Sequence, residues 1–225
     1  MKVILFGASG MVGQGVLREC LLDSNVESIL SIVRKPTGQQ HAKLRELAHG
    51  NFFDFSAIEA ELTGYDTCFF CLGVSSAGMS EQAYHRVTYD ITLAAAYVLA
   101  ANNPAMTFIY VSGTGTDSSE TGRSMWARVK GKTENALLRL PFKAAYMFRP
   151  GAIQPLHGIR SKTRLYDAIY RVTAPLLPLL KKLFPNSITT TEQVGRAMIR
   201  LAEENSGGGR GPSAPILETP DINAL

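Results

Sequence analysis

A glycine-rich turn near the start of the chain is the first feature whose residues could do chemistry. It reads Gly7-Ala-Ser-Gly-Met-Val-Gly13 and lies between an apolar run and a segment with helical spacing of apolar residues. Glycines in such a turn let backbone N–H groups approach a pyrophosphate, which then lies at the positive end of the helix. The spacing is G-x-x-G-x-x-G, which a packing requirement alone can also produce, but the strand–turn–helix context favours dinucleotide binding. The predicted contacts are Gly7, Ser9, Gly10, Met11, Val12 and Gly13.

The end of the second apolar run indicates which dinucleotide is bound. An NAD site usually places a carboxylate about 20 residues after the glycine turn, where it binds the ribose 2′-hydroxyl. Here the run ends in Arg34-Lys35 and no acid follows it. Two cations suit a 2′-phosphate, which a guanidinium can bind with two hydrogen bonds. We therefore expect NADP(H) rather than NAD(H), the alternative being a solvated basic strand end.

Four further segments carry a family resemblance. They are Asp54-Phe55, Cys71-Leu-Gly73, Tyr110-Val-Ser-Gly113 and Arg149-Pro-Gly151. With the glycine turn, their order resembles the short-chain dehydrogenase/reductase superfamily, in its atypical NAD(P)-binding, epimerase/dehydratase-like branch near the relatives of the Tat-interacting protein. The resemblance covers about residues 1–203 and implies an oxidoreductase. It implies further cofactor contacts at Asp54 and Phe55 (adenine), Cys71, Leu72 and Gly73 (ribose), and Pro150 and Ile153 (nicotinamide).

The catalytic signature of this superfamily is Tyr-x-x-x-Lys, but the chain reads Trp126-Ala-Arg-Val-Lys130 at that place. Residues four apart share a helix face, so Lys130 can reach the cofactor ribose while residue 126 faces the substrate. In the family the lysine lowers the pKa of the tyrosine, whose phenol exchanges the proton that accompanies hydride transfer. An indole N–H donates a hydrogen bond but does not titrate near neutral pH. The predicted catalytic set is Ser112, Lys130 and Trp126 in place of the tyrosine, and no metal ligands are predicted.

Each of these residues also has a plain structural interpretation. Lys130 could be an exposed helix lysine, Ser112 an ordinary residue at a strand end, and Trp126 either a lid over the substrate or an apolar patch. Other polar groups precede them on a long helix and are more often packing or surface residues than site residues. These are Tyr84, His85 and Tyr89; if the alignment of Trp126 fails, Tyr84 and Ser124 become the first proton donors to consider.

Strands and helices must alternate along the chain to position these residues. We predict strands at Val3–Phe6, Ile29–Val33, Asn51–Phe53, Thr67–Leu72, Met106–Val111 and Ala144–Phe148, and helices over about Met11–Leu21, Ser80–Ala101 and Trp126–Leu140. Continuous apolar runs are typical of strands buried on both faces, and their alternation with helices predicts a doubly wound parallel sheet with helices on both faces.

The pattern loosens after Pro150. We interpret residues 151–189 as a small substrate-side lobe of a single domain spanning 1–225, with prolines interrupting the apolar segment 174–185. Capping boxes at Thr189-x-x-Glu192 and Thr190-x-x-Gln193 predict a helix to about Glu203. Residues 206–211 read as a glycine-rich loop and Ala214–Glu218 as an edge strand.

Composition limits the class of protein. The 225 residues are 45% hydrophobic and 19% charged, which argues against disorder over most of the chain, and the net charge of +4 is dispersed without a nucleic-acid-binding run. No apolar stretch reaches the ~18–20 residues of a membrane span, and no secretory signal is visible, so we expect a cytoplasmic protein. Cys68 and Cys71 lie three apart in a strand, facing opposite ways, and are expected to be buried thiols rather than a disulfide.

These observations lead to an NADP(H)-binding, short-chain-dehydrogenase-like protein of oxidoreductase or epimerase type, with altered acid–base machinery and an unidentified small-molecule substrate. Losing a positioned acid costs about 10²–10⁴-fold in rate, so activity need not vanish. The alternative is a non-catalytic redox sensor that acts through a protein partner, with the segment 174–185 as its contact surface; a homodimer is also considered. Membrane-surface binding by that segment is disfavoured by its prolines at 175, 178 and 185.

Overall fold

A computed structural model describes residues 1–159, 186–207 and 211–225. Its main sheet has seven parallel strands in the order β3-β2-β1-β4-β5-β6-β9. The strands are β1 (Lys2–Phe6), β2 (Ser28–Val33), β3 (Leu44–Ala48), β4 (Thr67–Phe70), β5 (Thr107–Val111), β6 (Ala144–Arg149) and β9 (Ile216–Glu218). The order reverses between β1 and β4, as in doubly wound dinucleotide-binding folds. The predicted fold class is confirmed.

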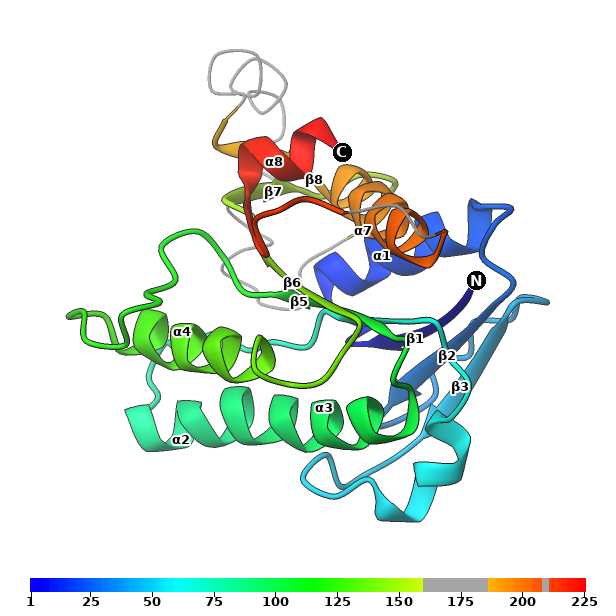
Figure 1. The fold of residues 1–225 in the computed structure, drawn as a ribbon, viewed down its shortest axis with the longest axis horizontal. Coiled ribbons are helices and arrows are strands. Elements are labelled where there is room, and N and C mark those ends of the chain that lie inside the picture. The colour runs from blue at the N-terminus through cyan, green and yellow to red at the C-terminus, as the bar shows by residue number, and fades with distance from the viewer. Residues whose placement is uncertain (160–185, 208–210) are drawn as a thin grey trace.

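Helices cover both faces of this sheet (Figure 1). They are α1 (Met11–Leu22), the 3₁₀ helix η1 (Ser56–Leu62), α2 (Glu81–His85), the π-helical turn η2 (Arg86–Asp90), α3 (Ile91–Asn102), α4 (Met125–Leu137), α7 (Thr191–Ser206) and α8 (Thr219–Ala224). Helices α2, η2 and α3 follow one another directly, which confirms the long helix predicted from about Ser80. None of the helices in the described part of the chain is long and apolar enough to cross a membrane.

Two hydrophobic cores lie on the two sides of the sheet because successive strand residues face opposite ways. Val3 and Leu5 of β1 belong to the core under α1 and α7, whereas Ile4 and Phe6 belong to the core under α3 and α4. The same alternation separates the two cysteines: Cys68 lies in the second core and Cys71 packs against the first. Both are free thiols, as predicted.

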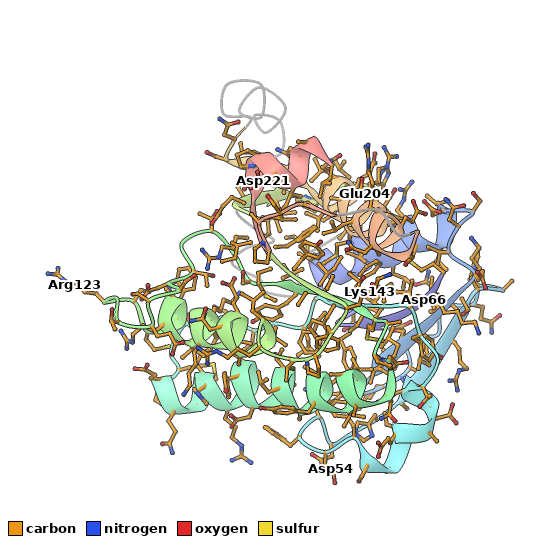
Figure 2. The ribbon with its side chains drawn as sticks, viewed as in Figure 1. Asp54, Asp66, Arg123, Lys143, Glu204 and Asp221 are labelled. Carbon is orange, nitrogen blue, oxygen red and sulfur yellow. The ribbon has the colours of Figure 1, made fainter. Side chains whose placement is uncertain are left out.

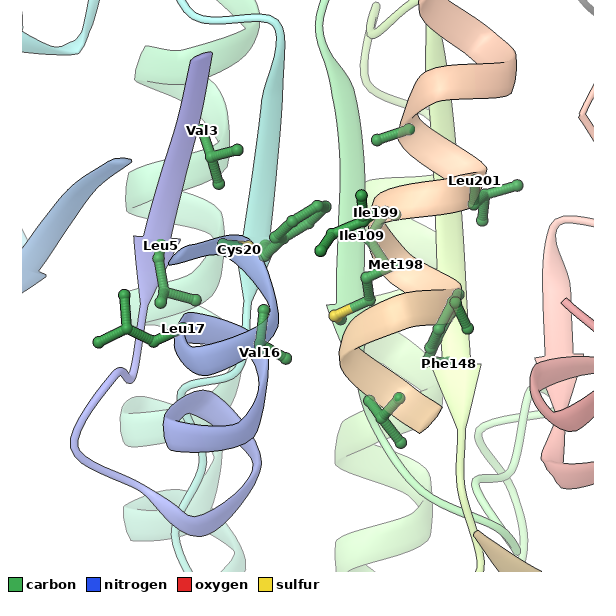
Figure 3. Packing of buried hydrophobic residues seen from close by; sticks show 14 of the residues in the cluster. Val3, Leu5, Val16, Leu17, Cys20, Ile109, Phe148, Met198, Ile199 and Leu201 are labelled. Carbon is green, nitrogen blue, oxygen red and sulfur yellow. The ribbon is translucent and has the colours of Figure 1, made fainter. Parts of the chain in front are cut away.

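Helices α1 and α7 touch at two glycines, and their apolar residues meet over the strands (Figure 3). A Cβ added at Gly15 would lie 2.6 Å from the Cβ of Thr191, and one added at Gly195 would lie 2.8 Å from the Cγ of Glu19. Glu19 is buried, and its carboxylate accepts a hydrogen bond from Nε of Arg196 at 3.1 Å. The backbones of α1 and α7 therefore pack directly against each other at these glycines.

The strand predicted at Asn51–Phe53 is wrong. The third strand is β3, Leu44–Ala48, which pairs with β2 at the edge of the sheet. An edge strand keeps alternate residues exposed and therefore lacks the continuous apolar run by which a buried strand is recognised. Phe52 instead buries its ring from the following turn, with its centroid 6.3 Å from that of Phe6.

The last part of the chain adds short elements beyond the predicted ones. Strands β7 (Ala152–Gln154) and β8 (Ile188–Thr190) form a separate parallel pair. The hydroxyl of Thr190 accepts a hydrogen bond from the N–H of Gln193 at 3.0 Å, so the predicted cap is present, although the Gln193 side chain bonds to Ile222 O instead of completing the box. Strand β9 confirms the predicted edge strand, and most of the proposed lobe, including 174–185, lies outside the described residues.

We predict that Gly15→Ala destabilises the protein. The new methyl group would overlap the Thr191 backbone carbonyl, 2.7 Å away, and overpacking of this kind costs about 1–3 kcal/mol. Urea denaturation followed by circular dichroism measures the change. Gly50→Ala is the matched control, because a Cβ there meets nothing within 4 Å. Equal stability of the two variants would contradict the close α1–α7 contact.

Candidate functional site

The glycine turn is shaped by two close backbone contacts. Gly7 has φ +84°, and a Cβ there would lie 2.7 Å from the backbone carbonyl of Cys71. A Cβ at Gly13 would lie 2.0 Å from the carbonyl oxygen of Gly7. By contrast, within the described part of the chain a Cβ at Gly10 would meet only that same oxygen, at 3.3 Å. Packing therefore requires Gly7 and Gly13, whereas the side of the turn at Gly10 is open.

On this open side, the described residues leave backbone donors at the start of α1 without a side-chain cap. Gly10 is the N-cap, no side chain caps the helix, and the first turn carries no acidic residue. The first helical hydrogen bond is from Gln14 N to Gly10 O, at 2.8 Å. The N–H groups of the first turn and the positive end of the helix dipole are thus available to an anion.

A cleft of about 960 Å³ runs from this turn to the loop after β2. Arg34 and Lys35 are exposed on its wall, so the structure brings them together with Ser9 of the glycine turn. Its lining residues are Ala8, Ser9, Gln14, Leu17, Val33, Arg34, Lys35, Pro36, Thr37, Gly38 and Gln39. The volume is at the upper end of ordinary ligand pockets, about 300–1,000 Å³.

The loop on the far wall of this cleft is held by a carboxylate that the sequence analysis missed. Glu46 of β3 accepts hydrogen bonds from the N–H of Thr37 at 2.9 Å and from its hydroxyl at 2.6 Å. The Thr37 hydroxyl in turn accepts from Gln39 N at 3.3 Å. The sequence Pro36-Thr-Gly38 is typical of a turn and could have predicted a structured loop. It could not have predicted that Glu46, on the neighbouring strand, binds Thr37.

The predicted adenine contacts lie in the turn before η1. The Asp54 side chain is exposed and projects outward (Figure 2). Its carboxylate accepts a hydrogen bond from Ser56 N at 2.9 Å, which lowers its pKa. The ring of Phe55 is buried against Phe6, with ring centroids 5.8 Å apart. A ligand would therefore meet the Asp54 carboxylate or the backbone here, not the Phe55 ring.

The predicted ribose and nicotinamide contacts follow β4 and β6. Cys71 and Leu72 are partly buried. The N–H of Cys71 donates a hydrogen bond to Phe6 O at 3.0 Å, beside the glycine turn. Gly73 is exposed, and a Cβ there would meet nothing within 4 Å. Pro150 accepts a hydrogen bond from Thr114 N at 3.0 Å, and Ile153 is buried in β7.

The corner between β5 and α4 brings the three predicted catalytic residues together. The amino group of Lys130 donates a hydrogen bond to the carbonyl oxygen of Ser112. Trp126, one turn earlier on α4, lies over the loop after β5, because its Cη2 atom would be 3.5 Å from a Cβ at Gly115. Lys130 and Trp126 thus share the helix face directed at the end of β5, as their spacing predicts.

A buried ion pair lies behind this corner. Glu134 of α4 is fully buried, and its carboxylate accepts hydrogen bonds from the guanidinium of Arg149, including Nε at 3.1 Å. The Ser112 hydroxyl also bonds to Glu134 and lies 3.1 Å from Phe148 O. Glu134 was missed by the sequence analysis, although an acid on the buried face of a helix was a usable signal.

The remaining polar candidates are three residues of the long helix and Ser124 before α4. The described hydrogen bonds among Ser112, Lys130, Glu134 and Arg149 do not include them. Tyr84 is buried, which raises its pKa. His85 pairs with Asp90 at 3.2 Å, and the ammonium of Lys132 lies 5.1 Å from the ring centroid of Tyr89. Ser124 is the exposed N-cap residue of α4.

No family model matches this chain. Curated proteins nevertheless resemble it over most of its length. It is 24% identical over 228 residues to Protein FMP52, mitochondrial, of Debaryomyces hansenii, covering 100% of this chain and 98% of the relative. It is 28% identical over 159 residues to Protein HTATIP2 of Rattus norvegicus, covering 68% and 62%.

Solved structures share the fold. The oxidoreductase ylbE from Lactococcus lactis superposes with a TM-score of 0.63 at 14% identity, covering 100% of this chain and 96% of that chain. A short-chain dehydrogenase/reductase oxidoreductase from Burkholderia thailandensis has a TM-score of 0.64 at 16% identity, covering 92% and 87%. The enzyme WbmF of Bordetella bronchiseptica, in complex with NAD⁺, has a TM-score of 0.63 at 15% identity, covering 99% and 76%.

The resemblance to atypical short-chain dehydrogenases/reductases is confirmed. The expected cytoplasmic location is wrong, because it conflicts with the names of the fungal relatives. FMP52 of D. hansenii and fmp52-2 of Aspergillus oryzae, which match 100% and 98% of this chain, are both named mitochondrial proteins. The expectation rested on the lack of a visible secretory signal, a feature that does not discriminate between intracellular compartments.

We predict that Glu134→Ala destabilises the fold by about 3–5 kcal/mol, because it leaves the buried Arg149 guanidinium with only the partly exposed Glu218 carboxylate, 3.5 Å away, as a counter-charge. Urea denaturation measures the loss. Glu204→Ala, which removes a half-exposed partner of Arg200 at 3.5 Å, is the control and should cost at most about 1 kcal/mol. The double variant Glu134→Ala, Arg149→Met should recover part of the loss; no recovery would argue against the ion pair as its cause.

Proposed function

We propose that this chain binds NADP(H) in the cleft between the glycine turn and the loop after β2, and uses it to reduce a carbonyl compound. The observation that carries the proposal is this cleft, which has unpaired helix N–H groups at one end and Arg34 and Lys35 on its wall. Solved structures with the same fold include the enzyme WbmF in complex with NAD⁺, which supports the proposal.

The pyrophosphate is assigned to the first turn of α1. The open side of Gly10 leaves room for phosphate oxygens, and the uncapped N–H groups supply donors. The helix dipole adds a favourable interaction with negative charge there. Gly7 and Gly13 hold the turn in place but do not themselves need to contact the ligand.

The 2′-phosphate is assigned to Arg34 and Lys35. Both side chains are exposed and free to close on a ligand, and β2 ends without the carboxylate that would favour a 2′-hydroxyl. The nearby carboxylate of Glu46 is already bonded to Thr37. The charge balance of this wall therefore supports NADP(H) over NAD(H).

The reacting end is assigned to the β5–α4 corner. NADP(H), when bound, supplies or accepts a hydride; the residues of the chain must hold it and exchange the proton. We assign Lys130, whose amino group lies at the end of β5 on Ser112 O, to the ribose hydroxyls. We assign Trp126 to the tyrosine position, where its indole N–H can donate a hydrogen bond but not a proton. Asp54, Cys71, Leu72, Gly73, Pro150 and Ile153 are the remaining proposed contacts.

The first prediction from this assignment concerns the glycine turn. Gly10→Val should leave the protein folded, since a Cβ there meets only Gly7 O at 3.3 Å, but should abolish NADPH binding by filling the approach to the helix N–H groups. Gly13→Val is the contrasting variant: its Cβ would lie 2.0 Å from Gly7 O, so the fold itself should suffer. Calorimetric titration with NADPH and thermal unfolding separate the two effects. Full binding by folded Gly10→Val would remove the assignment.

The second prediction concerns the choice of cofactor. The wild type should bind NADPH more tightly than NADH, and Arg34→Asp should reduce that preference about tenfold or more, because a charge-assisted hydrogen bond contributes about 1.5–3 kcal/mol. Arg123→Asp is the control, since Arg123 is exposed, projects outward from the loop before α4 (Figure 2) and does not line the cleft. Calorimetry with both cofactors measures the ratio. Equal wild-type affinities for NADPH and NADH would refute the 2′-phosphate site.

A further inference from the structure

The proposed reaction needs a proton source that the tyrosine position does not provide. Carbonyl reduction adds a hydride to carbon and a proton to oxygen, and the residue at the tyrosine position is Trp126. Its indole N–H does not titrate near neutral pH. The proton must therefore come from another group at the β5–α4 corner or from water.

The hydroxyl groups near this corner are poorly suited to the task. The Ser112 hydroxyl has one hydrogen, and it lies between two protein acceptors, the Glu134 carboxylate and the carbonyl oxygen of Phe148. Tyr84 and Tyr110 are both buried, and burial raises the pKa of each phenol. A phenol with a raised pKa gives up its proton reluctantly at neutral pH.

Lys130 differs from these groups in its surroundings. Its ammonium donates to a neutral partner, the backbone carbonyl of Ser112. The nearest acid on its own helix, Glu134, lies one turn away and is bonded to the Arg149 guanidinium from β6 and to the Ser112 hydroxyl. Arg149, which Glu134 shares with Glu218, offsets part of the Glu134 charge, so Glu134 stabilises the positive form of the lysine less than an unpaired carboxylate would.

Burial shifts the lysine toward a titratable range. It lowers the pKa of Lys130 to about 8, and the charge of Glu134 opposes this shift only in part. Among the described residues, the ionisable groups on the surrounding elements are Glu134, Arg149, Tyr84, Tyr110, Asp117 and Glu218. Glu218, at the end of β9, lies 3.5 Å from Arg149, and hydrogen bonds from Ser119 and Gly122 lower the pKa of Asp117. Lys130 is the member of this set suited to exchange a proton near neutral pH.

We propose that Lys130 is the acid of this site, supplying the proton that the phenol supplies in Tyr-x-x-x-Lys relatives. This rests on the proposed function. The carbonyl carbon receives the hydride from NADPH, the π electron pair moves to the oxygen, and one N–H bond of the ammonium breaks as the new O–H bond forms. The products are the alcohol, NADP⁺ and neutral Lys130, which regains a proton from water.

The test compares the wild type with Lys130→Arg. Arginine keeps the positive charge and the hydrogen-bond donors but cannot release a proton near neutral pH. Lys132→Arg is the matched control, because Lys132 is exposed two residues further along α4 and lies over Tyr89. Thermal unfolding confirms that each variant is folded, and Lys130→Met serves as a second variant if the arginine does not fit.

The first measurement needs no substrate. Calorimetric titration with NADPH at pH 8, in phosphate and in Tris, reports the protons taken up on binding. With a pKa of about 8, half of the Lys130 amines are neutral in the free protein, and the phosphates of NADPH raise that pKa. The wild type and Lys132→Arg should take up as much as roughly half a proton, and Lys130→Arg should lose this uptake while still binding NADPH.

The second measurement is the pH profile of NADPH oxidation with 4-nitrobenzaldehyde as the carbonyl probe. Wild-type kcat should fall as the pH rises through the pKa of the acid, because the acid must be protonated. Lys130→Arg should lose about 10²-fold or more in kcat with little change in the KM for NADPH.

The outcomes separate the two proposals. No binding of NADPH by the wild type overturns the proposed function, and the role of Lys130 with it. Binding with equal proton uptake by the wild type and Lys130→Arg, equal kcat for the two, or no reduction of the aldehyde by the wild type overturns the role of Lys130 and leaves cofactor binding standing. Loss of both uptake and turnover in Lys130→Arg alone supports it.

Discussion

Three stretches of backbone meet at the glycine turn, and the rest of the site depends on that contact. Gly7 has a left-handed conformation, with φ +84°, and a Cβ there would also lie 2.7 Å from the backbone of Cys71, just after β4, so the position favours glycine for two reasons. Gly13 lets the first turn of α1 pack directly against the backbone of Gly7, because a Cβ there would lie 2.0 Å from Gly7 O. The helix N-terminus is therefore held at the point where the strand order reverses, which is where ligands bind in doubly wound sheets. The cleft toward Arg34 exists because this turn is fixed on one side and the loop bonded to Glu46 on the other.

The second half of the sheet is organised by a buried charge pair. Glu134 and Arg149 connect α4 to β6, and Glu134 also takes the Ser112 hydroxyl at the end of β5. A buried ion must have its hydrogen bonds completed, so the pair restricts how α4 can rotate or slide on the sheet. That restriction places Trp126 and Lys130 at the strand end. The same Glu134 carboxylate opposes the lowering of the Lys130 pKa by burial, so the ion pair affects both the stability of this corner and the charge of Lys130.

The comparisons distinguish what the fold determines from what individual residues determine. Solved structures at 14–16% identity keep the same architecture, since it depends on apolar patterning that many sequences satisfy. Chemistry depends instead on single positions, such as Trp126 and Lys130 of α4, whose residue types a shared fold does not determine. The fungal relatives also correct the expected location, which depends on targeting rather than on the packing of the domain.

The sequence by itself determined the buried elements. Apolar runs predicted β1, β2, β4, β5 and β6. The glycines predicted the turn, and Thr190 predicted the start of α7. Strand burial, turn geometry and capping could be predicted because they are local properties of the sequence. Only the tertiary structure decided the third strand, which is an edge strand without a continuous apolar run. It alone also decided that Glu46 closes the loop after β2, that Glu134 pairs with Arg149, and that the Ser112 hydroxyl turns inward. Those partners lie on different elements, and which of them meet depends on how the helices and strands pack, which no local pattern records.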